Sequence, residues 1–526
     1  MIVEPAGEND FGALKSKQFH LFAFLISFLV ALPLLSTTYL TLFDYPNHVA
    51  RYGLIGQYQN SAVFKDFFVV NPRFIPNLGF DILAVNLCKV FPLAVASQLI
   101  IFGAIFFSSL GFCYLAKHVQ GRTTWLAFLP SVFLWSFSLI FGFNNYVLGL
   151  CFLPWSLLFF DQYCEKPRPQ FFLGYLVFTV FAFVCHAQVA ALTVAFAFVF
   201  AISREMSWPQ RRIMLGFAFL PVLCLLPLLA ISPSSGEFSK IQFGGIKHKI
   251  RMIGQVFLTG SLWTDLLFLL GLAATAAYLF LAKQVSITQR ALRVLIACIA
   301  ICFLTPTKLA IATNLDTRVV PIALAIAAAS LVPTKRLSPV LMFLVPGLIL
   351  FRSATAFVHL QSSGVVAQHV EQQLDHLPTN AVVFNVVADS NHIFNESEWS
   401  PPILNLAYYG MWKRPLYVSG LYAYPNQQPL LYSETGNKLD YLGILNPDQP
   451  QGDVGLQLKT HLTEIHKRMG LVPSTFWQSH VAYVFIGTTF PVKAPLPTGM
   501  ALIYEEPKFL IAKLDPFPGV IRDRLQ

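Results

Sequence analysis

Long apolar runs repeat along this 526-residue chain up to about residue 357 and then stop. A helix needs about 20 apolar residues to cross roughly 30 Å of hydrocarbon. Hydrophobic residues make up 55% of the chain and charged residues 12%, and the mean hydropathy is +0.60. This composition excludes an ordinary soluble protein. We therefore predict an α-helical polytopic membrane protein.

The apolar runs predict individual spans. Helices are expected near residues 19–42, 93–116, 124–141, 143–161, 213–231, 262–282, 291–305, 319–333 and 338–357. The remaining run, 171–202, would form a helix about 48 Å long, which is too long for a single pass. The run is also interrupted by Cys185-His186-Ala187-Gln188. Two passes that meet at His186 bring the predicted number of transmembrane helices to about eleven.

Loop charge favours the eleven-span topology with a cytoplasmic N-terminus, because basic residues concentrate in cytoplasmic loops. Downstream of residue 202, this topology places eight basic residues in cytoplasmic loops and six in outer loops. If 171–202 crossed the membrane only once, the eight would lie outside and the six inside. The eight are Arg204, Arg211, Arg212, Lys283, Arg290, Arg293, Lys335 and Arg336, and the six are Lys240, Lys247, Lys249, Arg251, Lys308 and Arg318. The prediction is a multi-pass protein of the inner (plasma) membrane with an extracytoplasmic C-terminal domain.

The basic residues behind the net charge of +10 are scattered among short loops, so we expect no nucleic-acid partner. The eight cysteines lie in or beside membrane segments without metal-ligand spacing, which argues against disulfides and zinc. No motif supports a cofactor, and none supports a divalent metal. The first apolar run is about 24 residues long and lacks a good cleavage site, so we interpret it as a retained span.

The predicted domains are a transmembrane domain, 1–358, and an extracytoplasmic α/β domain, 359–526. In the first, residues 43–92 form an outer segment with interfacial pieces at 62–70 and 78–90. A second outer segment, 232–261, resembles a mobile loop that either covers an anionic lipid headgroup or is merely solvated. In the second domain, helices are expected at 361–377, 402–412 and 455–469. Buried strands are expected at 381–387 and 481–487, with a terminal hairpin at 500–514.

The string Asp44-Tyr45-Pro46-Asn47-His48 follows the first span and leads to Arg51. Pro46 suits the first turn of a helix, and Asp44 suits its N-cap. His48 and Arg51 would then share one face of the helix. The alternative is that Asp44 only caps the helix and Arg51 only meets headgroups. Ionisable groups at the end of a span that face a bundle interior usually serve a substrate, which favours a catalytic role for Asp44 and His48.

Other polar groups fall near the same membrane face in the eleven-span topology. The candidates for substrate binding are Arg51, Arg73, Asn145, His186, Lys308 and Arg318. A carboxylate that acts as general base, together with cations that hold a leaving phosphate, suits group transfer from a phosphate-linked lipid donor.

The single first span with its acidic end, the long outer segment, about eleven spans and the C-terminal domain resemble the GT-C superfamily of membrane glycosyltransferases. Asp44-Tyr45-Pro46-Asn47-His48 is similar to an Asp-x-Pro-x-His string in bacterial membrane proteins of this kind. The resemblance implies an inverting transferase that uses a polyprenyl-phosphate sugar, with Asp44 in catalysis. The chain lacks a paired Asp-Glu motif after the first span.

The expected function is transfer of a sugar from a polyprenyl-phosphate donor to an envelope glycan or lipid acceptor on the extracytoplasmic side. The partners would be this donor, membrane lipid and the acceptor, with Arg318 and Lys308 on the donor phosphate. Besides a transferase of acyl or phosphoryl-alcohol groups, two alternatives stay open. One is a transporter or flippase for a lipid-linked sugar, which would place charges near mid-membrane. The other is a non-catalytic subunit of an envelope assembly complex.

Overall fold

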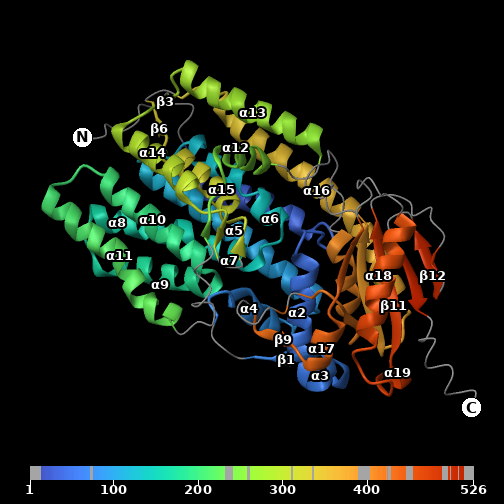
Figure 1. Cartoon of the computed structure of the whole chain (residues 1–526). Helices are drawn as coiled ribbons and strands as arrows, with labels where there is room; N and C mark the ends of the chain where they lie inside the picture. The colour runs from blue at the N-terminus through green and yellow to red at the C-terminus, as the bar shows by residue number, and fades with distance from the viewer. Residues whose placement is uncertain are drawn as a thin grey trace, which may run out of the picture. The chain divides into compact units, whose positions relative to one another are not determined.

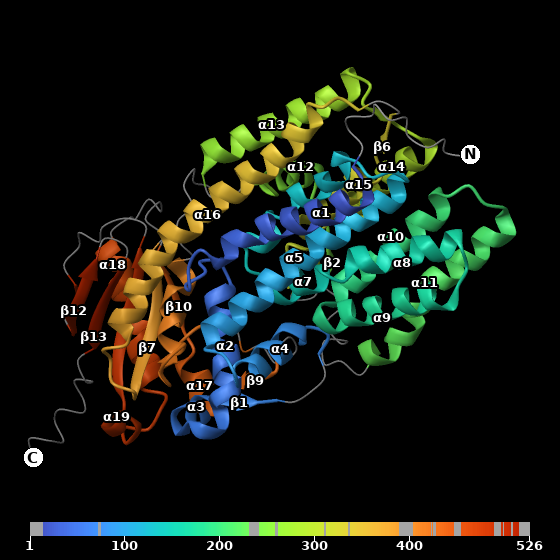
Figure 2. The same ribbon diagram turned by 180° about the vertical axis from the view of Figure 1, so that it is seen from behind.

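The computed structural model of the chain (Figures 1 and 2) describes residues 14–71, 75–230, 241–257, 261–309, 312–334, 337–388, 403–421, 423, 428–445, 454–488, 496–497, 499–506 and 509–514. The fold consists of two compact units. Unit 1 comprises Met1–Ser36, Phe74–Phe80 and Gln98–His359. Unit 2 comprises Thr37–Arg73, Asp81–Ser97 and Leu360–Gln526, and so takes in most of the predicted outer segment 43–92.

Six helices within the described ranges are long and apolar enough to cross a membrane. They are Ser16–Leu35, Leu93–Gln120, Asn144–Glu165, Trp208–Leu228, Leu262–Leu281 and Leu341–Leu374. Two shorter apolar helices, Pro169–Cys185 and Ala187–Ser203, accompany them. The chain thus has the helices of a membrane protein, as its composition predicted.

Most of the predicted spans appear as helices at the predicted positions. In chain order they are α1 (Ser16–Ala31), α5 (Leu93–Gln120), α7 (Asn144–Leu150) with α8 (Leu153–Glu165), α9 (Pro169–Cys185), α10 (Ala187–Ser203), α11 (Trp208–Ala230), α13 (Leu262–Leu281), α14 (Gln289–Leu304), α15 (Leu315–Ala329) and α16 (Leu341–Leu374). Short two-residue strands join some of their ends: β2 (Ile241–Gln242) pairs with β4 (Lys308–Leu309), β4 with β5 (Ala312–Thr313), and β3 (Val285–Ser286) with β6 (Val332–Pro333).

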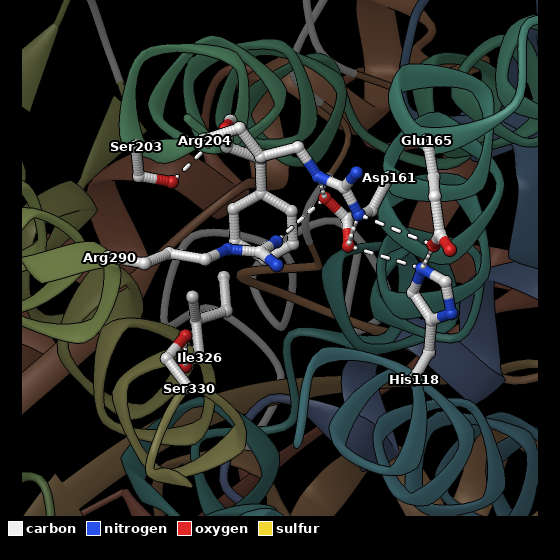
Figure 3. A network of polar contacts seen from close by, with 9 residues as sticks. His118, Asp161, Glu165, Ser203, Arg204, Arg290, Ile326 and Ser330 are labelled. Carbon is white, nitrogen blue, oxygen red and sulfur yellow. Dashed lines mark hydrogen bonds and ion pairs between the residues drawn. The ribbon is translucent and has the colours of Figure 1, made fainter. Parts of the chain in front are cut away.

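The predicted break at His186 is confirmed, because α9 ends at Cys185 and α10 begins at Ala187. Charged residues show that the chain returns to the face from which it came. Asp161 near the end of α8 is fully buried and accepts hydrogen bonds from Nε and Nη2 of Arg204, just after α10, at 3.0 and 3.1 Å. Arg290 of α14 donates to the same carboxylate at 2.7 Å, as Figure 3 shows.

His118 near the end of α5 completes this network at 3.2 Å from Asp161 and 3.7 Å from Glu165 (Figure 3). The C-terminal ends of α5, α8 and α10 and the N-terminal end of α14 therefore meet at one face of unit 1. This arrangement requires α9 and α10 to form a hairpin. A single straight helix over 171–202 would place Arg204 far from Asp161.

The prediction of a continuous helix over 124–141 is wrong. Residues Trp125–Phe133 form a 3₁₀ helix, η3, and only Phe137–Ile140 form an α-helical turn, α6. Pro130 lies inside this segment, where its ring and missing N–H disfavour an α-helix. All nine residues of η3 are buried, so packing compensates for the poorer hydrogen-bond geometry of a long 3₁₀ run.

The first span is shorter than predicted. Helix α1 passes into a 3₁₀ turn, η1 (Leu32–Leu35), which contains Pro33, and regular structure then stops until Tyr45. Asp44 is therefore separated from the span by irregular chain instead of following it directly.

The predicted outer loop 232–261 contains an ordered helix, α12 (Ile246–Gln255), and residues 231–240 and 258–260 lie outside the described residues. Lys249 of α12 is one of the four basic residues of this predicted loop. It is buried, with Nζ 2.8 Å from Oδ2 of Asp316 on α15. Ile246 and Ile250 are exposed. Lys247 and Arg251 are exposed beside them, so the outer face of α12 carries both apolar and cationic side chains, as helices at a membrane interface do.

Unit 2 is built around a mixed sheet in the order β10-β7-β11-β13-β12, with β8 also paired to β7. The strands are β7 (Ala381–Ala388), β8 (Tyr417–Val418), β10 (Leu442–Leu445), β11 (Val481–Thr488), β12 (Met500–Glu506) and β13 (Phe509–Leu514). β7 and β11 run parallel, and β12 and β13 form the predicted antiparallel hairpin. The buried strands and helix α18 (Val454–Met469) confirm their predictions. The segment 402–412 is a 3₁₀ helix, η5 (Ile403–Met411).

The remaining elements of unit 2 come largely from the first outer segment. They are α2 (Tyr45–Gln57), the 3₁₀ turn η2 (Tyr58–Asn60), α3 (Ala62–Phe67), β1 (Phe68–Val70) and α4 (Gly79–Leu87), the last of which begins in unit 1. β1 pairs with β9 (Leu430–Tyr432), far along the chain, and short helices α17 (Glu434–Leu439) and α19 (Phe476–Ser479) complete the unit. The two amphipathic pieces predicted at 62–70 and 78–90 are present as α3, β1 and α4.

Candidate functional site

Helix α2 begins as its sequence predicts. Asp44 occupies the N-cap, its carbonyl oxygen accepts from the N–H of His48 at 3.1 Å, and Pro46 lies in the first turn. The Asp44 side chain, however, makes no capping hydrogen bond. The backbone at Asp44 is right-handed helical, φ −88° and ψ −7°, whereas a capping residue needs an extended backbone to reach the free N–H groups. Asp44 is nevertheless 7% exposed, so a buried carboxylate stands here without the expected capping role.

Arg51, one turn beyond His48, is fully buried. Its Nε and Nη2 donate to the two oxygens of Asp81 on α4 at 2.9 and 3.1 Å, which is the bidentate geometry that a guanidinium favours. Nη1 lies 3.0 Å from Nδ1 of His48. Because a guanidinium can only donate, Nδ1 accepts this bond, and a neutral His48 then carries its proton on Nε2.

The C-terminal part of unit 2 holds the chain around Asp44 in place. Asn405 of η5 donates to the carbonyl oxygen of Phe43 at 2.7 Å, and the Trp412 indole donates to that of Pro46 at 3.2 Å. No local pattern connects Asn405 with Asp44, because the two residues are more than 300 positions apart. Hydrogen bonds on both sides of Asp44 fix its backbone, which is the rigidity a positioned general base requires.

Two of the predicted substrate-binding residues, His186 and Arg318, meet in unit 1 at the break between α9 and α10. Arg318 of α15 has Nη1 3.3 Å from Nε2 of His186, and its guanidinium carbon lies 3.7 Å from the centre of the Phe143 ring. Asn145 of α7 accepts from the backbone N–H of Phe80 at 2.7 Å. Arg318 is 8% exposed, so much of its guanidinium surface is covered by protein.

His186 has two competing donors. Its Nδ1 lies 3.3 Å from the backbone N–H of Gln188, and its Nε2 faces Arg318. A neutral imidazole has one acceptor nitrogen, so only one of the two contacts is a hydrogen bond at a time. The cavity lined by Arg318 and residues of η3 and α7 measures about 10 Å³, which is room for one water.

The other predicted cations lie apart from this cluster. Lys308 belongs to strand β4 and is half-buried, while Asp316, eight residues later, pairs with Lys249. Arg73 lies outside the described residues. Among the residues that the structure does describe, no three His, Cys, Asp or Glu side chains are grouped so that they could hold a metal ion.

Unit 2 also contains a cavity of about 560 Å³ between α2, the segment 85–95 and residues near η5. Glu371, near the end of α16, lies on its wall with a side chain that is 2% exposed. The Tyr39 hydroxyl donates to Oε2 of Glu371 at 3.1 Å, and Nζ of Lys413 lies 2.5 Å from Oε1. Sequence analysis missed all three residues, which come from three distant segments without a common motif.

Comparison of the chain with models of known protein families and with curated proteins found no match.

Proposed function

We propose that this chain is a membrane glycosyltransferase that moves a sugar from a polyprenyl-phosphate-linked donor to an envelope glycan or lipid on the extracytoplasmic side. Asp44 is the proposed general base. The observation that carries the proposal is the position of Asp44, a carboxylate that is 7% exposed at the start of α2 and whose neighbours Phe43 and Pro46 are held by hydrogen bonds from Asn405 and Trp412.

In the proposed reaction the Asp44 carboxylate removes the proton from an acceptor hydroxyl. The oxygen then forms a bond to the anomeric carbon of the donor sugar, and the bond from that carbon to the phosphate oxygen breaks. Polyprenyl phosphate leaves with the electron pair, and the configuration of the sugar inverts. Positioned general bases typically contribute 10²–10⁴-fold to such steps.

His48 is proposed to act beside Asp44 as a second proton-transfer group. Its Nδ1 is held by Arg51, which is itself fixed by both oxygens of Asp81. This chain of contacts sets the tautomer of a neutral His48, so that its proton stands on Nε2. Arg51 and Asp81 would then be positioning residues.

The membrane arrangement belongs to the same proposal. We place the N-terminus in the cytoplasm and count eleven passes, with η3 and α6 together as one of them and α9 and α10 as two. The network around Asp161 supports a hairpin of α9 and α10. Lys308 and Arg318 remain proposed ligands of the donor phosphate. The cavity beside Arg318 measures only about 10 Å³ and Lys308 does not line it, so the two residues are tested separately.

A transporter for a lipid-linked sugar is the second candidate. The observation that favours it is the interruption of the helices at His186, where Arg318 lies, together with the long 3₁₀ helix η3 within unit 1. Broken helices with charged residues at the break are typical of transporter substrate sites.

One experiment separates the two functions. Purified protein in liposomes receives polyprenyl-phosphate sugars with a radiolabelled sugar, together with lipid acceptors. Transfer predicts that label appears on the acceptor and that unlabelled polyprenyl phosphate accumulates in equal amount. Movement of the intact donor between leaflets, without cleavage of the sugar–phosphate bond, would contradict the transferase and support the transporter.

A further inference from the structure

We infer that the 560 Å³ cavity of unit 2 is a binding site for the phosphodiester headgroup of an acidic membrane phospholipid. The inference does not rest on the proposed transferase function. A volume of this size lies within the range of small-molecule sites, roughly 300–1,000 Å³. Asp44 does not line the cavity, whose α2 residues begin at Gly53, nine residues further along the chain.

Two glycines of α2, Gly53 and Gly56, line the cavity. A Cβ atom at Gly53 would lie 2.4 Å from Cδ2 of Leu93, so this glycine allows close approach of α2 to the start of α5. A Cβ atom at Gly56 would meet nothing within 4 Å. One turn of α2 therefore packs against its neighbour and the next turn faces open space.

The charges on the wall favour an anion. Lys89 and Lys413 both line the cavity and both are exposed, whereas Glu371 is buried. The hydrogen bond to Glu371 raises the pKa of Lys413, so this lysine stays charged. Burial raises the pKa of the Cys88 thiol to about 11, so the thiol adds no negative charge. Two lysines against one carboxylate leave one positive charge, which matches the single negative charge of a phosphodiester.

The surface next to the cavity is apolar. Ile82 and Leu83 of α4 are 50% and 44% exposed, and Val90 and Phe91 just beyond α4 are 76% and 40% exposed. Phe91 also lines the cavity. A run of exposed large apolar residues beside a lysine is typical of a segment that lies in the membrane interface. The acyl chains of the phospholipid would therefore lie along residues 82–91, while its headgroup reaches Lys89 and Lys413.

The test uses the full chain in nanodiscs of phosphatidylcholine that contain spin-labelled phosphatidylglycerol. Electron paramagnetic resonance measures how strongly this lipid associates relative to spin-labelled phosphatidylcholine. Lys89→Gln should lower the preference about fivefold, the usual effect of one juxtamembrane lysine. Gly56→Leu should lower it as well, because the leucine side chain fills the cavity. Lys459→Gln, an exposed lysine of the same unit on α18, is the matched control and should change nothing.

An unchanged preference for phosphatidylglycerol in Lys89→Gln would overturn the inference. An equal loss of preference in Lys459→Gln would overturn it too, because it would indicate an effect of diffuse surface charge. Phosphatidylglycerol with a photoreactive acyl chain should crosslink to residues 82–91, and crosslinks only elsewhere would contradict the site. The crosslinking experiment tests the site in the wild-type protein, so it decides the question if Gly56→Leu fails to fold. Displacement of the lipid by inorganic phosphate in the wild type, but not in Lys89→Gln, would assign the site to free phosphate instead.

Discussion

Arg51 contributes to stability through its contact with Asp81, and the two residues have to be changed together to separate charge from packing. Arg51→Met should lower stability by about 3–5 kcal/mol, because it removes the guanidinium from a buried carboxylate. The double variant Arg51→Met with Asp81→Leu should recover most of the loss. Thermal unfolding in detergent measures both. A single variant as stable as the wild type would show that the buried pair contributes little.

Arg318 stacks on Phe143, and lysine cannot reproduce that contact. Arg318→Lys should lower stability by about 1–2 kcal/mol, the range for a desolvated cation–π contact. Phe143→Leu is the matched control, since it weakens the stack and keeps the charge. If Arg318 also binds the donor phosphate, Arg318→Lys should raise KM for the donor more than Phe143→Leu does. Equal values of KM would leave Arg318 with a structural role only.

Asp440 gives unit 2 a pH dependence. Burial, the largest influence, raises the pKa of this carboxyl above its ordinary value of 3.8. Between the two values the folded state holds more protons than the unfolded state, so stability falls as the pH rises from about 4 upward. Asp440→Asn can still accept from the N–H of Gly420. Its thermal unfolding temperature should vary less with pH over this range, and an unchanged slope would contradict the assignment.

Among the helices, the hairpin of α9 and α10 determines on which side of the membrane the chain after residue 203 lies. On a cysteine-free background, Glu205→Cys reports the end of α10, and Lys459→Cys reports the C-terminal part. Both positions are exposed. Eleven passes predict that a membrane-impermeant maleimide reaches residue 459 from outside and residue 205 only after permeabilisation. Labelling of both residues from the same side would contradict this topology.

The sequence predicted those elements whose residues are decided by local pattern. Apolar length identified the apolar helices, and excess length with a polar interruption identified the break at His186. Hydropathy could not distinguish the 3₁₀ helix η3 from an α-helix, because both bury apolar side chains. Pro130 was the available signal.

The site was less predictable. Pro46 and Asp44 correctly marked the start of α2, but the backbone angles at Asp44, which prevent capping, are set within the folded unit. Lys249 appeared to be a loop cation and is buried on Asp316. The cavity groups Tyr39, Glu371 and Lys413 come together only through long-range packing, for which a single sequence carries no signal.

For the molecule as a whole, we propose that a membrane protein with these apolar helices carries out its chemistry through one carboxylate, Asp44. Folding and chemistry can be tested separately at Asp44, because the neighbouring backbone is held by Asn405 and Trp412 whichever side chain stands there. Asn has nearly the shape of Asp and does not bury a charge. Asp44→Asn should therefore leave thermal stability close to that of the wild type.

The most direct test is the turnover of Asp44→Asn in the liposome transfer assay, measured beside its unfolding temperature. Asp66→Asn, which changes an exposed carboxylate of the same unit, is the control and should keep full turnover. We predict that Asp44→Asn lowers turnover by about 10²–10⁴-fold with nearly unchanged stability, as expected for loss of a general base. Full turnover in a folded Asp44→Asn variant would contradict the account.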